Sequence, residues 1–178
     1  HTFQATTEKF SERPFLYFED EMWTYGDTNK AANSLARYLI STGVKHGDRV
    51  VLFMENRPSF VISLLALNKI GAIAVLINTS LTGDPLVHCI NSSDSVKCIL
   101  GAERADVLED VLNQINVTKK EDFLWVEDTS EYSLPNWAID LKAQLDISDN
   151  ENLEETNSVR VKDIACYIFT SGTTGVPK

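Results

Sequence analysis

The chain has 178 residues, of which 43% are hydrophobic and 24% are charged, as in a globular protein that is long enough to bury a sizeable core. Its 16 basic and 26 acidic residues give a net charge of −10, which argues against nucleic acid as a main partner. No stretch approaches the roughly 18 continuous apolar residues of a transmembrane helix, and the N-terminus lacks the pattern of a signal peptide.

The first part of the chain is expected to form a helix, a β-hairpin and a second helix. The first helix is predicted over 2–11. The paired strands are predicted over 14–19 and 22–25, on either side of an acidic turn. Thr24 and Asp27 then resemble a capping box, which begins an amphipathic helix that ends at Gly43.

Apolar strands and helices alternate in the middle of the chain. The strands are predicted over 49–54, 72–77, 96–100 and 123–126, and the helices over 58–69, 85–91 and 105–115. Continuous apolar strands separated by helices indicate a parallel sheet that is covered on both faces. The predicted fold class is therefore α/β, a layered parallel sheet flanked by helices, with an N-terminal β-hairpin.

The stretch from Asp146 to Asn157 differs from the rest of the chain in composition. It carries five acidic residues and two large apolar ones, and no spacing within it is typical of metal ligands. Such a composition offers little apolar surface to offset the entropy of ordering. We therefore expect 146–157 to be a flexible acidic linker within the domain.

The cysteines do not indicate a metal site or a disulfide framework. Cys89, Cys98 and Cys166 are odd in number and show no C-x-x-C spacing, which favours buried thiols in a reducing compartment. His88 lies beside Cys89 but no further ligand cluster accompanies it. No metal ligand is assigned in this chain.

The last twelve residues carry the most specific chemical pattern. An apolar run over 165–169, predicted to be a short buried strand, leads into small residues and then Val-Pro-Lys. Glycines let a ligand approach the backbone, short hydroxyls and successive N–H groups bind anions, and the final lysine supplies a cation. These features suit a polyphosphate. The candidate phosphate-binding residues are Thr170, Ser171, Gly172, Thr173, Thr174, Gly175 and Lys178.

The spacing of this loop distinguishes it from other phosphate loops. The pattern is G-x-x-G-x-x-K, whereas a Walker A loop needs G-x-x-x-x-G-K-[ST] and dinucleotide-binding or kinase loops need G-x-G-x-x-G. A flexible Ser/Thr/Gly-rich linker is the alternative interpretation. A linker would require neither a strand directly before it nor a Pro-Lys pair at a fixed distance after the second glycine.

The segment from Phe169 to Lys178 resembles the [YF]-[ST]-S-G-[ST]-T-G-x-P-K signature of the adenylate-forming superfamily, which includes acyl-CoA synthetases, luciferases and the adenylation domains of peptide synthetases. Weaker similarities lie upstream. They comprise Phe15-Leu16, Trp23-Thr24-Tyr25, Gly47-Asp48-Arg49-Val50 and Asn56-Arg57-Pro58-Ser59-Phe60. The segment 71–79, followed by Leu86, His88 and Cys89, looks most like the very-long-chain acyl-CoA synthetase and fatty-acid transport protein branch.

This resemblance implies that 1–178 is the N-terminal portion of an AMP-binding domain, with the rest of that domain, the C-terminal domain and the catalytic lysine beyond it. The implied enzyme is an acid–thiol ligase. It would use ATP and Mg²⁺ to convert a long- or very-long-chain fatty acid into an acyl-adenylate and would then transfer the acyl group to coenzyme A. The 178 residues alone are expected to be inactive.

The resemblance further implies an intracellular protein associated with a membrane, on the cytosolic face of the endoplasmic reticulum, plasma membrane or peroxisome, through regions outside this chain. Two alternatives stay open. One is an adenylating enzyme that does not use coenzyme A, such as a peptide-synthetase or luciferase-like enzyme. The other is a non-catalytic fatty-acid transport or binding protein.

Overall fold

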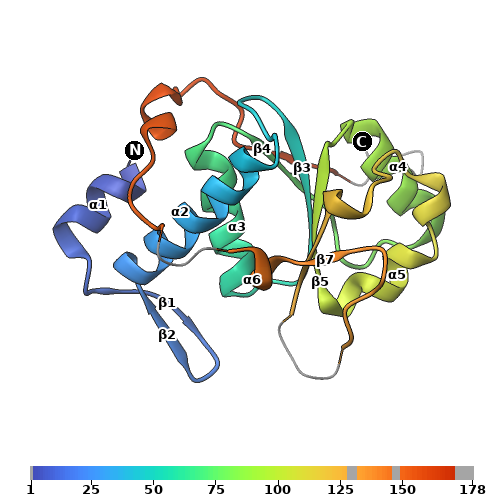
Figure 1. Ribbon diagram of the computed structural model, residues 1–178, viewed down its shortest axis with the longest axis horizontal. Coiled ribbons are helices and arrows are strands. Elements are labelled where there is room, and N and C mark those ends of the chain that lie inside the picture. The colour runs from blue at the N-terminus through green and yellow to red at the C-terminus, as the bar shows by residue number, and fades with distance from the viewer. Residues whose placement is uncertain (1, 128–131, 146–148, 171–178) are drawn as a thin grey trace.

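A parallel sheet forms the centre of the computed structural model, which describes residues 2–127, 132–145 and 149–170. The sheet has six strands in the order β7-β6-β5-β3-β4-β8 (Figure 1). The strands are β3 (Arg49–Phe53), β4 (Ile73–Leu76), β5 (Lys97–Gly101), β6 (Phe123–Val126), β7 (Ile139–Asp140) and β8 (Cys166–Ile168). Every pair of neighbouring strands is parallel, which confirms the predicted sheet.

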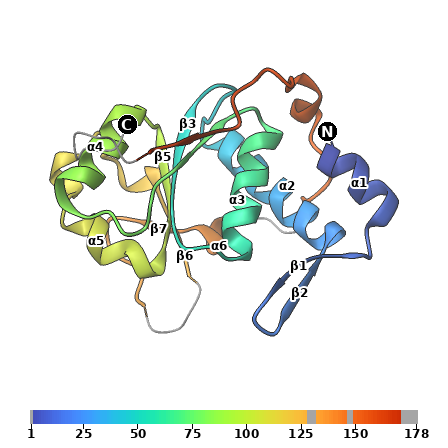
Figure 2. The ribbon, with the colours of Figure 1, turned by 180° about the vertical axis from the view of Figure 1, so that it is seen from behind.

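Helices cover both faces of this sheet (Figures 1 and 2). On one face lie α2 (Tyr25–Ser41) and α3 (Pro58–Lys69), and on the other lie α4 (Gly83–Ser93) and α5 (Ala105–Glu109). Strand β3 shows why both faces are apolar: Val50 and Leu52 pack in the cluster with α2 and α3, whereas Val51 and Phe53 pack in the cluster with α4 and α5. Because side chains alternate along a strand, a continuous apolar run serves two layers.

The N-terminal elements also follow the prediction. Helix α1 (Thr2–Phe10) precedes the antiparallel strands β1 (Pro14–Phe18) and β2 (Glu21–Thr24). The capping box is present, since Thr24 Oγ1 accepts a hydrogen bond from the Asp27 amide at 3.0 Å and the Asp27 carboxylate accepts one from the Thr24 amide at 3.4 Å. Thr24, the last residue of β2, therefore caps the N-terminus of α2.

The helix predicted over 105–115 is shorter in the structure. Helix α5 ends at Glu109, and a 3₁₀ turn, η2 (Leu112–Gln114), follows. Two acidic residues, Glu109 and Asp110, lie at the C-terminal end of α5, where the helix dipole disfavours negative charge. The predicted apolar face nevertheless remains, because Leu108, Val111 and Ile115 are all buried in the same cluster.

Four short elements complete the fold. They are the 3₁₀ helices η1 (Ala102–Arg104), η3 (Lys120–Asp122) and η4 (Glu154–Ser158), and the helix α6 (Leu141–Gln144). The sequence analysis did not identify β7 or α6. Their signal is weak because β7 has two residues and α6 has four, although Asp140 does accept hydrogen bonds from the amides of Lys142 and Ala143 as an N-cap residue.

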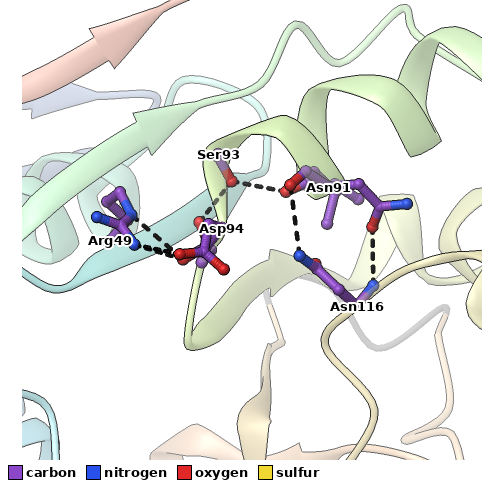
Figure 3. Close-up of polar contacts among 7 residues, drawn as sticks. Arg49, Asn91, Ser93, Asp94 and Asn116 are labelled. Atoms are coloured by element: carbon purple, nitrogen blue, oxygen red, sulfur yellow. Dashed lines mark hydrogen bonds and ion pairs between the residues drawn. The ribbon is translucent and has the colours of Figure 1, made fainter.

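A network of hydrogen bonds and an ion pair lies at the end of the sheet at which β3 and β5 begin (Figure 3). Asp94 ends α4 in the left-handed conformation, with φ of 51°. Arg49 donates to the Asp94 carbonyl oxygen at 3.1 Å and pairs with its carboxylate at 2.6 Å. Asn91 Oδ1 accepts a hydrogen bond from the Asn116 amide at 2.8 Å. The C-terminal end of α4 is thereby attached both to β3 and to the chain after η2.

The described part of the acidic stretch, 149–157, is packed against α2. Asn33 Nδ2 donates to the Asn150 carbonyl oxygen at 2.8 Å, and Arg37 Nε pairs with Asp149 Oδ1 at 2.7 Å. Leu153 is only 3% exposed. Most of the acceptors are backbone carbonyls, and the donors lie on a helix more than a hundred residues earlier in the chain. The flexibility of 146–157 stays a prediction. Residues 146–148 lie outside the described residues.

The packing of this segment can be tested with Asn33→Ala. Asn33 is fully buried, and its loss removes hydrogen bonds to the Asn150 carbonyl oxygen and to Asn152 Oδ1, each of which contributes about 0.5–1.5 kcal/mol. We expect faster limited proteolysis within 149–158 in the full-length variant and no change in Lys30→Ala, which alters an exposed residue of the same helix. Equal cleavage rates in wild type and Asn33→Ala would show that these contacts do not hold the segment.

Lys69, in the last turn of α3, is a buried charge. Its side chain belongs to a residue that is 5% exposed, its Nζ has no hydrogen-bond partner among the described residues, and burial lowers its pKa to about 8. Because an unfolded lysine has a pKa of about 10.4, the unfolded chain binds more protons between pH 8 and that value. The contribution of Lys69 to the free energy of unfolding should therefore be least favourable below about pH 8 and should improve as the pH rises to about 10.4.

We expect Lys69→Met to raise the free energy of unfolding at pH 7 by about 1–3 kcal/mol, since each pKa unit corresponds to about 1.4 kcal/mol and burial is not complete. The gain should shrink at pH 9.5. Thermal unfolding of the full-length protein at both values measures this difference. Lys9→Met, at an exposed lysine in the last turn of α1, is the matched control. A loss of stability in Lys69→Met at pH 7 would contradict the prediction.

Candidate functional site

The carboxyl ends of β3, β4 and β8 border a cleft of about 550 Å³. The residues that line it are Met54, Glu55, Asn56, Phe60, Leu76, Ile77, Asn78, Thr79, Ile168 and Phe169. In open α/β sheets, ligands bind outside the carboxyl ends of the strands, where loops rather than side-chain layers cover the backbone. The cleft is therefore the candidate functional site of the described residues.

At the same edge of the sheet, two neighbouring strands are followed by loops that lead to opposite faces. Strand β3 lies between β4 and β5, the chain after β3 enters α3 on one face, and the chain after β5 enters α5 on the other. Neighbouring loops that leave toward opposite faces open a crevice between them, the topological switch point of such sheets. Both loops carry charged residues, of which only Arg57 was noted in the sequence, as part of the motif 56–60.

A buried ion pair joins these two loops. Arg57 Nη2 lies 2.7 Å from Glu103 Oε1, and their side chains are 7% and 11% exposed. The same carboxylate oxygen accepts a hydrogen bond from the Glu55 amide at 2.9 Å. Gly101 leaves room for this arrangement, because a Cβ at that position would overlap the Glu103 carboxylate. Glu103 thus fixes the backbone after β3 from the loop after β5.

Arg104 extends the network to the third loop. It pairs with the Glu55 carboxylate and donates a hydrogen bond to the Thr79 carbonyl oxygen at 3.3 Å. The loops after β3, β4 and β5 are therefore cross-linked by charged groups, and Glu55 and Thr79 also line the cleft. The ion pairs and hydrogen bonds of this network hold the loops on one side of the cleft in place.

Strand β8, which precedes the predicted phosphate loop in the sequence, ends at this edge. It pairs with β4, and the Ala74 amide donates to the Ala165 carbonyl oxygen at 3.1 Å. The prediction of a buried strand was wrong in one respect: β8 lies at the edge of the described sheet, Ile168 is 67% exposed, and Cys166 is only partly buried. The apolar run indicated a strand but gave no information on the number of its neighbours.

Of the candidate phosphate-binding residues, Thr170 is described. It is exposed and follows Phe169, which lines the cleft. The other candidates lie outside the described residues. They are Ser171, Gly172, Thr173, Thr174, Gly175 and Lys178.

Comparison with known proteins decides the family. The sequence model of the family described as "AMP-binding enzyme" matches residues 3–178. The chain belongs to the AMP-binding enzyme family. This confirms the resemblance to adenylate-forming enzymes.

Two curated relatives illustrate the branch to which this AMP-binding chain is similar. It is 32% identical over 179 residues to long-chain fatty acid transport protein 6 of Mus musculus, covering 99% of this chain and 28% of that protein. It is 35% identical over 187 residues to the medium/long-chain-fatty-acid–CoA ligase FadD6 of Mycobacterium tuberculosis, covering 99% and 27%. The chain thus spans little more than a quarter of these relatives.

Solved structures share the fold of this AMP-binding chain. The anthranilate CoA ligase AuaEII in complex with anthranoyl-AMP superposes with a TM-score of 0.86 at 21% identity, over 99% of this chain and 32% of that one. A fatty acyl CoA synthetase of Mycobacterium tuberculosis superposes with a TM-score of 0.75 at 25% identity, with the same coverage. The predicted fold, the first part of the N-terminal domain of such ligases, is confirmed.

The remaining reactive groups of the AMP-binding chain add no second site to its described part. Cys89 and Cys98 are buried, Cys166 is half-buried, and burial raises the pKa of both buried thiols. Within residues 2–127, 132–145 and 149–170, no cluster of three or more His, Cys, Asp or Glu side chains is arranged to hold a metal ion. The helices in these ranges are also too short or too polar to cross a membrane.

Proposed function

We propose that the full-length protein is a fatty acid–CoA ligase that works through an acyl-adenylate. A carboxylate oxygen of the fatty acid attacks the α-phosphorus of ATP, and the bond to pyrophosphate breaks. The thiol of coenzyme A then attacks the acyl carbonyl carbon, and AMP leaves. The observation that supports the proposal is the loop signature of 169–178, which in the sequence directly follows a strand that ends at the cleft.

The residues of this chain would bind and orient ATP. In the proposal, the backbone N–H groups and hydroxyls of 170–175 donate hydrogen bonds to phosphate oxygens, and Lys178 offsets the negative charge that builds on the leaving pyrophosphate. Mg²⁺ bound with ATP would share that charge. The two glycines suit this role because they leave space next to the backbone. The catalytic lysine is expected outside the chain.

The names of the relatives support a fatty acid as the substrate. Both a long-chain fatty acid transport protein and a medium/long-chain-fatty-acid–CoA ligase match nearly the whole chain. The same names support association of the full-length protein with a membrane, which we place at the cytosolic face of the endoplasmic reticulum, plasma membrane or peroxisome. In the proposal, regions outside this chain make that attachment.

The name of the transport proteins also favours a second candidate, a protein that binds or moves fatty acids without activating them. The two candidates differ in chemistry. Only a ligase releases pyrophosphate, and only a ligase that uses coenzyme A forms a thioester.

The experiment is pyrophosphate release by the full-length protein with ATP, Mg²⁺ and a panel of carboxylic acids, with and without coenzyme A. We expect release that depends on a medium- to very-long-chain fatty acid and continues over many turnovers when coenzyme A removes the adenylate. Release without thioester formation would indicate an adenylating enzyme with another acceptor. Fatty-acid binding without release under any condition would favour the transport protein.

A further inference from the structure

The sheet alone determines the position of β8 only weakly. The strand has three residues and pairs with β4 on one side, while its other side has no partner strand in the described part of the chain. Ile164, two residues before the strand, and Ile168, its last residue, are 52% and 67% exposed. With three residues, β8 has few ladder hydrogen bonds to fix its register, and contacts outside the strand can contribute to fixing it.

Asp163, three residues before β8, makes two such contacts. Its Oδ2 accepts a hydrogen bond from the Arg160 amide at 2.7 Å, and the Asp163 amide in turn donates to the Arg160 carbonyl oxygen at 3.0 Å. The same Oδ2 lies 3.0 Å from His46 Nε2. Because a carboxylate only accepts, the Nε2 of His46 carries the proton. The hydrogen bonds from Arg160 and then His46 lower the pKa of Asp163.

His46 itself is held in a fixed place. It belongs to a turn in which the Lys45 amide donates to Asp48 Oδ2 at 2.8 Å and the Gly47 amide donates to the Gly71 carbonyl oxygen at 2.8 Å. The imidazole lies over Gly71, whose φ is 70° and where any Cβ would overlap the ring. The turn therefore joins the beginning of β3 to the chain that enters β4, and presents His46 to Asp163.

The contact of Asp163 lies close to the first ladder bond of β8. Ala165, two residues further on, accepts the hydrogen bond of the Ala74 amide. A slip of β8 along β4 would therefore break either this bond or the contact with His46. Upstream, the chain is attached to α2 through the contacts of Asn150 and Asp149.

We propose that His46 and Asp163 form a clamp that sets the register of β8 and thereby positions the phosphate loop at its other end. Both are positioning residues, because neither reaches the cleft. The proposal rests on the proposed function of the loop. The competing explanation is an ordinary surface pair: the side chains of His46 and Asp163 are 49% and 19% exposed, and such pairs often contribute little.

The test compares His46→Ala, His46→Gln and Asp94→Asn in the full-length protein. We expect His46→Ala to speed hydrogen exchange in a peptide that covers 164–170 but not in one that covers β5. We also expect it to raise the KM for ATP about two- to fivefold, while kcat and the KM for the fatty acid stay nearly unchanged. The amide N–H of Gln reaches the position of Nε2, so His46→Gln should restore both values. Asp94→Asn removes another surface ion pair of β3 and should change neither.

Hydrogen exchange separates this proposal from the function on which it rests, since it reads β8 whether or not the loop binds ATP. Unchanged exchange over 164–170 in His46→Ala would overturn the clamp. Failure of His46→Gln to restore protection would also overturn it, because the donor at Nε2 would then not be the cause. Faster exchange with an unchanged KM for ATP would overturn the link between the clamp and the loop.

Discussion

Gly172→Val and Gly175→Val are expected to slow adenylation by the full-length protein at least as much as Lys178→Ala, which should slow it about ten- to a hundredfold. Replacing the lysine removes a charge-assisted interaction worth roughly 1.5–3 kcal/mol, and each 1.36 kcal/mol is tenfold in rate. A valine side chain at either glycine would block the approach of the phosphates to the backbone and disfavour positive φ. The measurement is fatty-acid-dependent exchange of pyrophosphate into ATP.

A matched lysine variant controls for the loss of charge alone. Lys119→Ala alters an exposed lysine that is distant in sequence from 170–178. Because truncation of such a surface residue changes the free energy by less than about 0.5 kcal/mol, the rate of pyrophosphate exchange should stay within about twofold of wild type. Exchange at the wild-type rate in Lys178→Ala would remove this lysine from the mechanism. Normal rates in both glycine variants would refute the assignment of 170–178 as the phosphate loop.

Glu103→Ala is expected to destabilise the fold by about 3–5 kcal/mol. The substitution removes the carboxylate from a buried ion pair and leaves the Arg57 guanidinium without that partner in a position that is 7% exposed. It also removes the acceptor of the Glu55 amide at the border of the cleft. Thermal unfolding of the full-length protein measures the change, and we also expect a higher KM for ATP because the loop after β3 is freed.

Two further variants show whether the loss of stability in Glu103→Ala comes from breaking the buried ion pair. Replacing both partners, as in Arg57→Met with Glu103→Leu, removes both charges of the pair and should recover most of the stability. Asp94→Asn, at the exposed pair with Arg49 (Figure 3), should cost less than about 1 kcal/mol. A Glu103→Ala protein as stable as wild type would show that the pair does not hold the loops together.

The sequence predicts the sheet well because each strand carries its own signal. Val50 to Phe53 are apolar without interruption, as burial on both faces requires, and the helices between strands dictate parallel pairing. The capping box at Thr24 was equally local. The break after Glu109 was missed because the apolar face at 108, 111 and 115 continues through a 3₁₀ turn and looks the same in sequence.

Long-range polar contacts could not be predicted from the sequence. The charged residues that join the loops beside the cleft, such as Arg57 and Glu103, are far apart in the chain and follow no periodic pattern. The packing of 149–157 depends on backbone carbonyls, which every residue has, and on donors such as Asn33 that have no distinctive spacing. By contrast, a phosphate loop at 169–178 could be predicted from sequence alone because its signature consists of contiguous residues.

Activation of a fatty acid as its adenylate can be followed through the oxygen atoms of the carboxylate. The full-length protein is incubated with ATP, Mg²⁺, coenzyme A and a long-chain fatty acid whose carboxylate carries ¹⁸O. Attack of a carboxylate oxygen on the α-phosphorus leaves that oxygen on the nucleotide, so we expect AMP that contains one ¹⁸O for each acyl-CoA formed. Formation of ADP, or of AMP without the label, would exclude an acyl-adenylate.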